Sequence, residues 1–323
     1  MDFENRSEVE AALLRGDLPK NGRTQAVVVA KACGVFDVQG RMTLDLGIKV
    51  PVCFQPEPHP FGQVPADLAI VKQGLDVIAL GKAYHPRIAG GGQSRVTARV
   101  GGDERQLAIF GERLWYRSLD GHWRISEPQD FSLLELTWEH SFGGVSFDAY
   151  RDDNMHPLNK DGKGFVASEE AIEDTALPNI EDPAQLITSW QDQPRPCNIA
   201  PAPKHIAFDP MPYVAEIQNA AQTPFRVPDS LWNDAVTKFR FEGVQPGAEV
   251  TLSGMSEVPL ALHLPTFQLQ ARVALGNNES TVPLRLDTLL FFPEARRCTF
   301  SWRASFTYDF VPKQQRRVTL EKR

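Results

Sequence analysis

The strongest constraint on the fold is a period-two alternation near the end of the chain. Residues 297–310 alternate apolar and polar side chains without a break. The apolar set is Cys298, Phe300, Trp302, Ala304, Phe306, Tyr308 and Phe310. Because successive strand residues point to opposite faces, the pattern predicts one long strand with Trp302 and Phe306 buried against a second layer. An aromatic row can also stack on nucleic-acid bases, but the acidic balance and the lack of interleaved basic clusters favour core packing.

Shorter runs of the same kind predict a mainly β protein. Alternating or β-branched segments occupy residues 24–38, 42–48, 76–84, 94–100, 106–116, 131–140 and 268–275. Gly, Pro and Asn separate them, as is typical of turns between strands. We therefore expect antiparallel sheets packed as a sandwich or barrel-like core, with helix content well below strand content.

Composition and charge narrow the class of protein. The chain has 323 residues, of which 42% are hydrophobic, and its net charge of -7 argues against binding to nucleic-acid phosphates. No apolar run approaches the roughly 20 residues that span a bilayer, and the first residues are acidic, unlike a secretory leader. We expect a cytoplasmic protein without membrane insertion. The cysteines Cys33, Cys53, Cys197 and Cys298 lack zinc-site spacing and are expected to be buried free thiols.

Both ends are set apart from a single large β-rich domain at residues 17–311. Within the leader, residues 1–16, a capping serine and a terminal glycine predict a short helix over residues 7–14. The tail, residues 312–323, has five basic residues against one acidic residue, a local net charge of +4. A disordered, solubilising end is the favoured interpretation, and a docking tail for an acidic partner is the alternative.

A long irregular excursion is expected at about residues 145–234, where turn-forming residues are frequent. Only weak helical patterns, at residues 168–174 and 182–190, interrupt it. Long irregular loops in compact domains are usually functional or disordered. Its Pro-rich part, residues 194–228, either binds a partner or covers a sheet edge. The candidate partner-binding anchors are Ile206, Phe208, Met211, Tyr213 and Phe225.

Catalytic and metal sites have little support in the sequence. Glu135 and Glu139 would lie about 13 Å apart along a strand, too far for a glycosidase pair. Residues 144–148 and 161–167 lack the full patterns of a nucleophile elbow and a P-loop. An acidic cluster without EF-hand spacing predicts a solvated turn rather than a cation site. Its members are Asp148, Asp152, Asp153 and Asn154. We therefore expect no catalytic residue, no metal and no cofactor.

Several blocks, in this order, resemble a known bacterial family. They lie at residues 67–72, 76–83, 110–115, 136–144, 159–165 and 177–181, the fourth reading Leu-Thr-Trp-Glu-His-Ser-Phe-Gly-Gly. The chain is similar to domain of unknown function 2169, whose members resemble adaptor chaperones of the type VI secretion system. The likeness covers most of the chain and departs between residues 201 and 234. It implies a non-enzymatic adaptor that binds a secreted effector, a spike protein or both, and helps load the effector onto the spike.

The matched blocks supply residues that we expect to be structural. The glycines suit tight turns or close backbone approach, and the charged residues suit buried polar ties. The set is Asp67, Lys72, Asp76, Gly81, Gly111, Arg113, Trp115, Trp138, Glu139, Phe142, Gly143, Gly144, Asn179 and Glu181. Two alternatives stay open. One is a β-sandwich hydrolase or carbohydrate-active enzyme that uses acidic residues of residues 145–181, and the other is a structural component of the spike.

Overall fold

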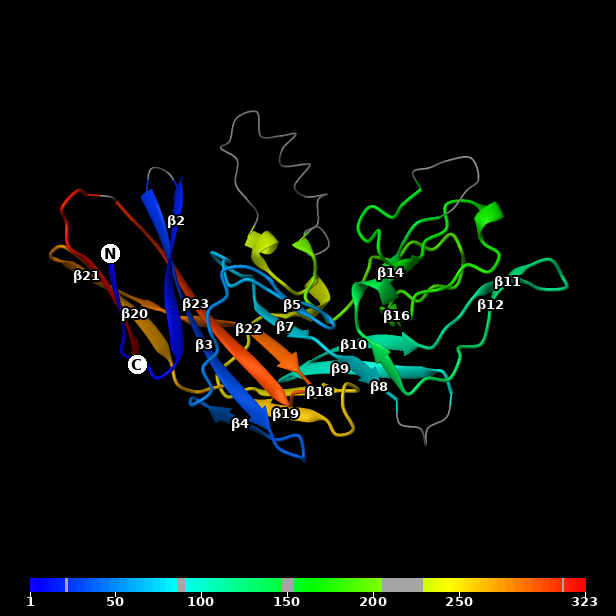
Figure 1. The fold of residues 1–323 in the computed structure, drawn as a ribbon, viewed down its shortest axis with the longest axis horizontal. Coiled ribbons are helices and arrows are strands. Elements are labelled where there is room, and N and C mark those ends of the chain that lie inside the picture. The colour runs from blue at the N-terminus through cyan, green and yellow to red at the C-terminus, as the bar shows by residue number, and fades with distance from the viewer. Residues whose placement is uncertain (21–22, 86–90, 147–153, 205–228, 310) are drawn as a thin grey trace.

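The structure consists of packed β-sheets with a smaller irregular lobe at one end, whose own core residues lie within residues 115–187 (Figure 1). The computed structural model describes the chain except for residues 21–22, 86–90, 147–153, 205–228 and 310. Within the described residues, residues in strands far outnumber residues in helices. Short 3-10 helices occur at η1 (Trp138–His140), η2 (Glu169–Ala171), η3 (Asp229–Trp232) and η4 (Thr237–Phe239). The predicted mainly β fold is confirmed.

The largest sheet has seven strands. Its order is β17 (Arg240–Phe241), β7 (Leu75–Ala79), β22 (Arg285–Phe292), β23 (Arg297–Tyr308), β3 (Arg23–Phe36) and β2 (Glu10–Lys20), with β4 (Met42–Asp45) also paired to β3. Neighbouring strands are antiparallel except for β7 and β22, which are parallel. The long alternating segment forms β23, which pairs with β3 along its whole length.

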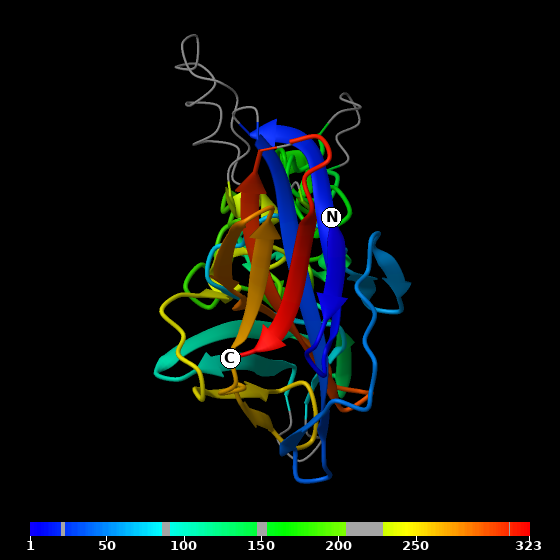
Figure 2. The same cartoon turned by 90° about the vertical axis from the view of Figure 1, so that its left-hand side faces the viewer.

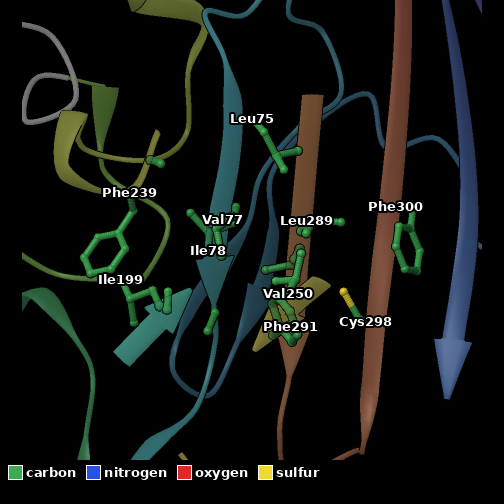
Figure 3. Packing of buried hydrophobic residues seen from close by; sticks show 14 of the residues in the cluster. Leu75, Val77, Ile78, Ile199, Phe239, Val250, Leu289, Phe291, Cys298 and Phe300 are labelled. Carbon is green, nitrogen blue, oxygen red and sulfur yellow. The ribbon is translucent and has the colours of Figure 1, made fainter. Parts of the chain in front are cut away.

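Aromatic side chains of β23 enter the main core, as Figure 3 shows for Phe300. Phe300 is fully buried, and its ring lies 5.9 Å from that of Trp302, centroid to centroid. The predicted burial of Trp302 is confirmed, since only 3% of it is exposed. The predicted burial of Phe306 is wrong. This side chain packs against the core but stays half-buried, because the covering layer reaches only part of it.

A five-stranded sheet packs on the large one. Its order is β16 (Ile180–Glu181), β10 (Asp103–Phe110), β9 (Gln93–Val100), β18 (Glu249–Ser253) and β19 (Leu260–His263). Val96 and Val250 of this sheet belong to the same buried cluster as Leu289 and Phe300 of the large sheet. Burial of apolar faces on each other therefore holds the two sheets together, as in a sandwich.

Strands from both ends of the chain form a four-stranded sheet, which faces the viewer in Figure 2. Its order is β1 (Asp2–Asn5), β24 (Arg316–Lys322), β20 (Leu269–Leu275) and β21 (Asn278–Pro283). The expected helix at residues 7–14 is wrong. Most of these residues form part of β2, because they pair with β3 along its edge. The expected disordered tail is also wrong. Val318 and Leu320 are fully buried, and burial of this apolar pair holds the basic end in the sheet.

Short hairpins and paired segments build the lobe and its surroundings. They pair β5 (Glu57–His59) with β6 (Gly62–Val64), β8 (Lys82–Tyr84) with β13 (Leu133–Glu135), β11 (Trp115–Arg117) with β12 (Trp123–Ile125), and β14 (Phe142–Gly143) with β15 (Lys163–Gly164). The lobe has its own core of Trp115, Phe142, Val166, Ile172, Leu177 and Ile187. The predicted strand over residues 131–140 ends at Glu135, and η1 follows. Alternate burial continues through Leu136 and Trp138, so the sequence pattern resembles a longer strand.

Candidate functional site

A polar row crosses one face of the large sheet. Asp76 lies opposite Thr288, Thr288 opposite Ser301, and Ser301 opposite Lys31. Directly opposed residues of neighbouring strands share a face, so these four side chains form one line. The adjacent row on the other face is Val77, Leu289, Phe300 and Ala32. Because all four residues of the polar row are buried, this face needs a cover that supplies hydrogen-bonding partners.

Residues 53–73 provide part of that cover. The Lys31 ammonium lies 2.8 Å from Asp67 Oδ2, which also accepts the backbone N–H of Cys53 at 2.7 Å. Arg303 of β23 donates to the backbone carbonyls of Asp67 and Ala69, at 2.8 and 2.6 Å. Its other partner is Asp287 Oδ2, at 2.8 Å. The cover is therefore bound to the sheet through charges that are almost wholly buried.

Lys72 is the centre of a second buried group of charges. Its Nζ lies 2.5 Å from Asp234 Oδ2 and 3.1 Å from Asp76 Oδ2, and it donates to Thr288 Oγ1 at 2.7 Å. Asp76 also accepts the Asn233 amide at 2.8 Å and the Asp234 backbone N–H at 2.7 Å. Residues 233–234 are thereby fixed over the sheet.

The pKa shifts of Lys72, Asp76 and Asp234 are those of a buried structural ion-pair group. Burial acts to lower the pKa of Lys72, but the carboxylates of Asp234 and Asp76 outweigh burial and raise it above its usual value. Burial raises the pKa of Asp76, against the pull of Lys72. Burial also opposes ionisation of Asp234, yet Lys72 and Lys204 together hold its pKa below the usual value. The raised pKa keeps Lys72 protonated at neutral pH, as its ion pairs with Asp76 and Asp234 require.

A third group of polar residues fixes the lobe to the five-stranded sheet. Asn179 donates to the Phe110 carbonyl at 3.0 Å, and its Oδ1 lies 2.8 Å from His140 Nδ1. Arg113 pairs with the Glu181 carboxylate and lies 3.7 Å over the Phe110 ring. Arg113, Asn179 and Glu181 are all buried, so the lobe is joined to the sheet by buried polar contacts, in which Arg113 Nε alone of these groups has no hydrogen-bond partner.

The predicted structural residues are buried as expected, with the exception of Glu139. Asp67, Lys72, Asp76, Arg113, Asn179 and Glu181 are buried, as expected for polar ties. Trp115, Trp138 and Phe142 are also buried. Glu139 is exposed, so its expected role as a buried tie is wrong: like Glu135 it takes an exposed position of the alternation that buries Leu136 and Trp138.

The motif glycines lie where side chains would collide. A Cβ on Gly111 would lie 1.8 Å from the Gln129 carbonyl oxygen. Gly143 has a φ of +148°, and a Cβ there would lie 2.0 Å from the Asn159 carbonyl oxygen. Gly144 also has positive φ, and Gly81 packs against the carboxylate of Glu294. These contacts, rather than chemistry, account for glycine at these positions.

Gly111→Ala will lower the free energy of unfolding by about 1–3 kcal/mol, because the backbone near Gln129 must shift to admit a methyl group. Chemical denaturation measures the loss. Gly102→Ala is the matched control, since nothing lies within 4 Å of a Cβ there and φ is not positive. Equal stability of the two variants would contradict the packing argument.

A cleft of about 600 Å³ lies between the β5–β6 hairpin, η1 and residues 200–204. Phe61, Leu68, Trp138 and Trp232 contribute apolar surface, and Glu139, Asp161, Lys204 and Asp234 contribute charge. Asp234 belongs to the Lys72 group, and Trp138 Nε1 donates to the Pro201 carbonyl at 2.8 Å. The buried polar groups therefore fix two walls of this cleft.

The sequence did not single out several residues of these groups. They are Lys31, Lys204, Asn233, Asp234, Asp287 and Arg303. Lys31 had a usable signal, a charge that directly follows the apolar run at residues 26–30. The predicted anchors Ile206, Phe208, Met211, Tyr213 and Phe225 lie outside the described residues, as do Asp148, Asp152 and Asp153.

Three further features concern the described residues: metal sites, cysteines and membrane spans. No His, Cys, Asp and Glu side chains there gather in a group suited to a metal ion. The four cysteines are buried free thiols, as predicted. No helix in the described part of the chain is long and apolar enough to cross a membrane.

Comparison with known proteins gives one match. A family model described as "Uncharacterized protein conserved in bacteria (DUF2169)" matches residues 21–303. No curated protein and no solved structure matches. The matched range includes the Lys72 group and the lobe, and it excludes β1 and β24.

Proposed function

We propose, for a chain that belongs to the bacterial family DUF2169, a non-enzymatic role as an adaptor. In this role the protein binds a type VI secretion effector in the cytoplasm and helps load it onto the secreted spike. The cleft beside η1 is the surface that we assign to the partner.

The observation that carries this proposal is the make-up of the cleft. Its lining combines apolar and aromatic side chains with charged groups, as protein-binding surfaces do. Partly exposed Leu68, at 47%, offers apolar surface for a partner to cover. Such a surface suits recognition of another protein.

Rigidity also supports an adaptor. The contacts of Lys72 with Asp76 and Asp234 hold the wall at residues 232–234, and Asn159 donates to the carbonyls of Trp138 and Phe142 at 2.8 and 3.1 Å. A wall that is already ordered loses little conformational entropy when a partner binds. The buried charged residues of the family blocks, such as Lys72 and Asp76, thus act through structure.

The proposal is tested by copurification with a candidate type VI secretion effector from the same bacterium. The parent is expected to give a stoichiometric complex. Leu68→Asp is expected to weaken it about tenfold, because it places a charge on the apolar surface to be buried. Leu133→Asp is the matched control, since Leu133 is also exposed, at 55%, and lies outside the cleft. Failure of the parent to bind, or equal binding by both variants, would contradict the assignment.

A second candidate function has one observation in its favour. Glu139 and Asp161 line the same cleft as Trp138 and Trp232, and acids beside aromatic rings are also found where enzymes hold sugars. A carbohydrate-active enzyme would turn over a glycan without an effector present. Glu139→Gln would abolish that turnover, whereas an adaptor has no turnover to lose.

A further inference from the structure

We propose that the cleft selects an extended partner segment that carries arginine or lysine between apolar residues. This inference rests on the proposed function, because it names the chemistry of the partner that the adaptor would hold. It follows from an imbalance between hydrogen-bond donors and acceptors in the described lining.

Prolines shape much of the cleft. Those in the lining are Pro56, Pro60, Pro65, Pro201 and Pro203. A proline nitrogen carries no hydrogen, so its peptide unit offers only a carbonyl oxygen. Walls of this kind present acceptors to a bound chain and few backbone donors.

Three side-chain donors of the lining, among them its cation Lys204, are engaged within the protein. Trp138 Nε1 donates to Pro201, and Asn159 Nδ2 donates to the carbonyls of Trp138 and Phe142. Lys204 Nζ lies 2.7 Å from Asp234 Oδ1 and 3.0 Å from the Asn233 carbonyl. An anionic ligand group would therefore compete with Asp234 and the Asn233 carbonyl for Lys204.

The carboxylates divide into two kinds. Asp234 has both oxygens engaged, one by Lys72 and the other by Lys204. Glu139 and Asp161 are exposed, and within the described residues their side chains have no ion-pair partner. These two carboxylates give the cleft its available charge, and that charge is complementary to a cation.

Aromatic surface completes the fit to arginine or lysine. Trp138, Trp232 and Phe61 lie in the same lining as the two available carboxylates. A guanidinium or ammonium group can lie over an aromatic face while it donates to a carboxylate, and apolar neighbours can cover the remaining surface. An acidic peptide would meet like charge from Glu139 and Asp161.

Fluorescence anisotropy on the full chain tests this proposal. The probe is a short, labelled peptide of leucine, proline and arginine, compared with the same peptide in which citrulline replaces arginine. Citrulline keeps the shape and removes the charge. We expect about tenfold weaker binding of the citrulline peptide, and a similar loss for the arginine peptide with the double variant Glu139→Gln, Asp161→Asn.

The control variant is Glu127→Gln with Asp130→Asn, which removes the same two acid types from exposed positions outside the cleft. It is expected to bind the arginine peptide like the parent. Equal binding of the two peptides, or equal loss in both double variants, would overturn the inference.

Effector copurification separates this inference from the proposed function. If the effector binds the parent and the peptides show no charge selectivity, the cleft inference fails and the adaptor proposal stands. If the peptides behave as expected and no effector binds the parent, the adaptor proposal fails and the selectivity of the cleft stands.

Discussion

Lys72→Met is expected to lower the free energy of unfolding by about 3–5 kcal/mol. The substitution keeps much of the side-chain length but removes the ammonium that lies between Asp76 and Asp234. Two buried carboxylates then face each other without that counter-charge. Denaturant titration at neutral pH measures the loss. Lys49→Met is the control, because the Lys49–Glu10 pair is exposed and should contribute about 1 kcal/mol or less.

The same variant has a distinctive pH dependence. In the parent, the pKa of Asp234 lies below its usual 3.8, so its stabilising contribution is present at neutral pH and is lost as pH falls through that lowered value. In Lys72→Met, burial without Lys72 raises the carboxylate pKa values. As pH falls, the buried carboxylates of the variant are therefore protonated before those of the parent, and this protonation removes their repulsion. The stability gap should narrow between neutral pH and about pH 4. A gap that stays constant or widens would contradict this account.

Trp302→Ala is expected to cost about 3–5 kcal/mol, because it removes a buried ring that packs against Phe300 and Phe267. The Phe267 centroid lies 5.5 Å from that of Trp302. Phe306→Ala on the same strand face should cost clearly less, since Phe306 is only half-buried. Denaturant midpoints of the two variants test the order. Equal losses, or a larger loss for Phe306→Ala, would show that the two positions are equally well covered.

The strands could be predicted wherever local pattern and tertiary environment agree. Residues 297–308 alternate because β23 has one apolar face and one polar face, and this period is visible in sequence alone. The predictions for residues 7–14 and 316–322 were wrong because local pattern and tertiary environment disagree there. Their local patterns are short, and their strand state depends on pairing with β3 and β20.

The buried polar groups could be predicted only in part. The family resemblance pointed to Lys72 and Asp76, four residues apart. Asp234 lies 162 residues from Lys72 in the chain and meets it only because residues 233–234 cover the large sheet. Arg303 and Asp287 likewise meet across β22 and β23. A sequence pattern carries the charge of such residues but not the topology that pairs them.

The pairing of β1 with β24 imposes an order on the folding of this chain. Residues 2–5 are synthesised more than three hundred positions before their strand partner, residues 316–322. Closing so long a loop costs more entropy than closing a local hairpin. β1 therefore cannot take its place in this sheet until residues 316–322 have been synthesised. Truncation before residue 316 would remove an inner strand, and β1 would lose the neighbour that holds it in its sheet.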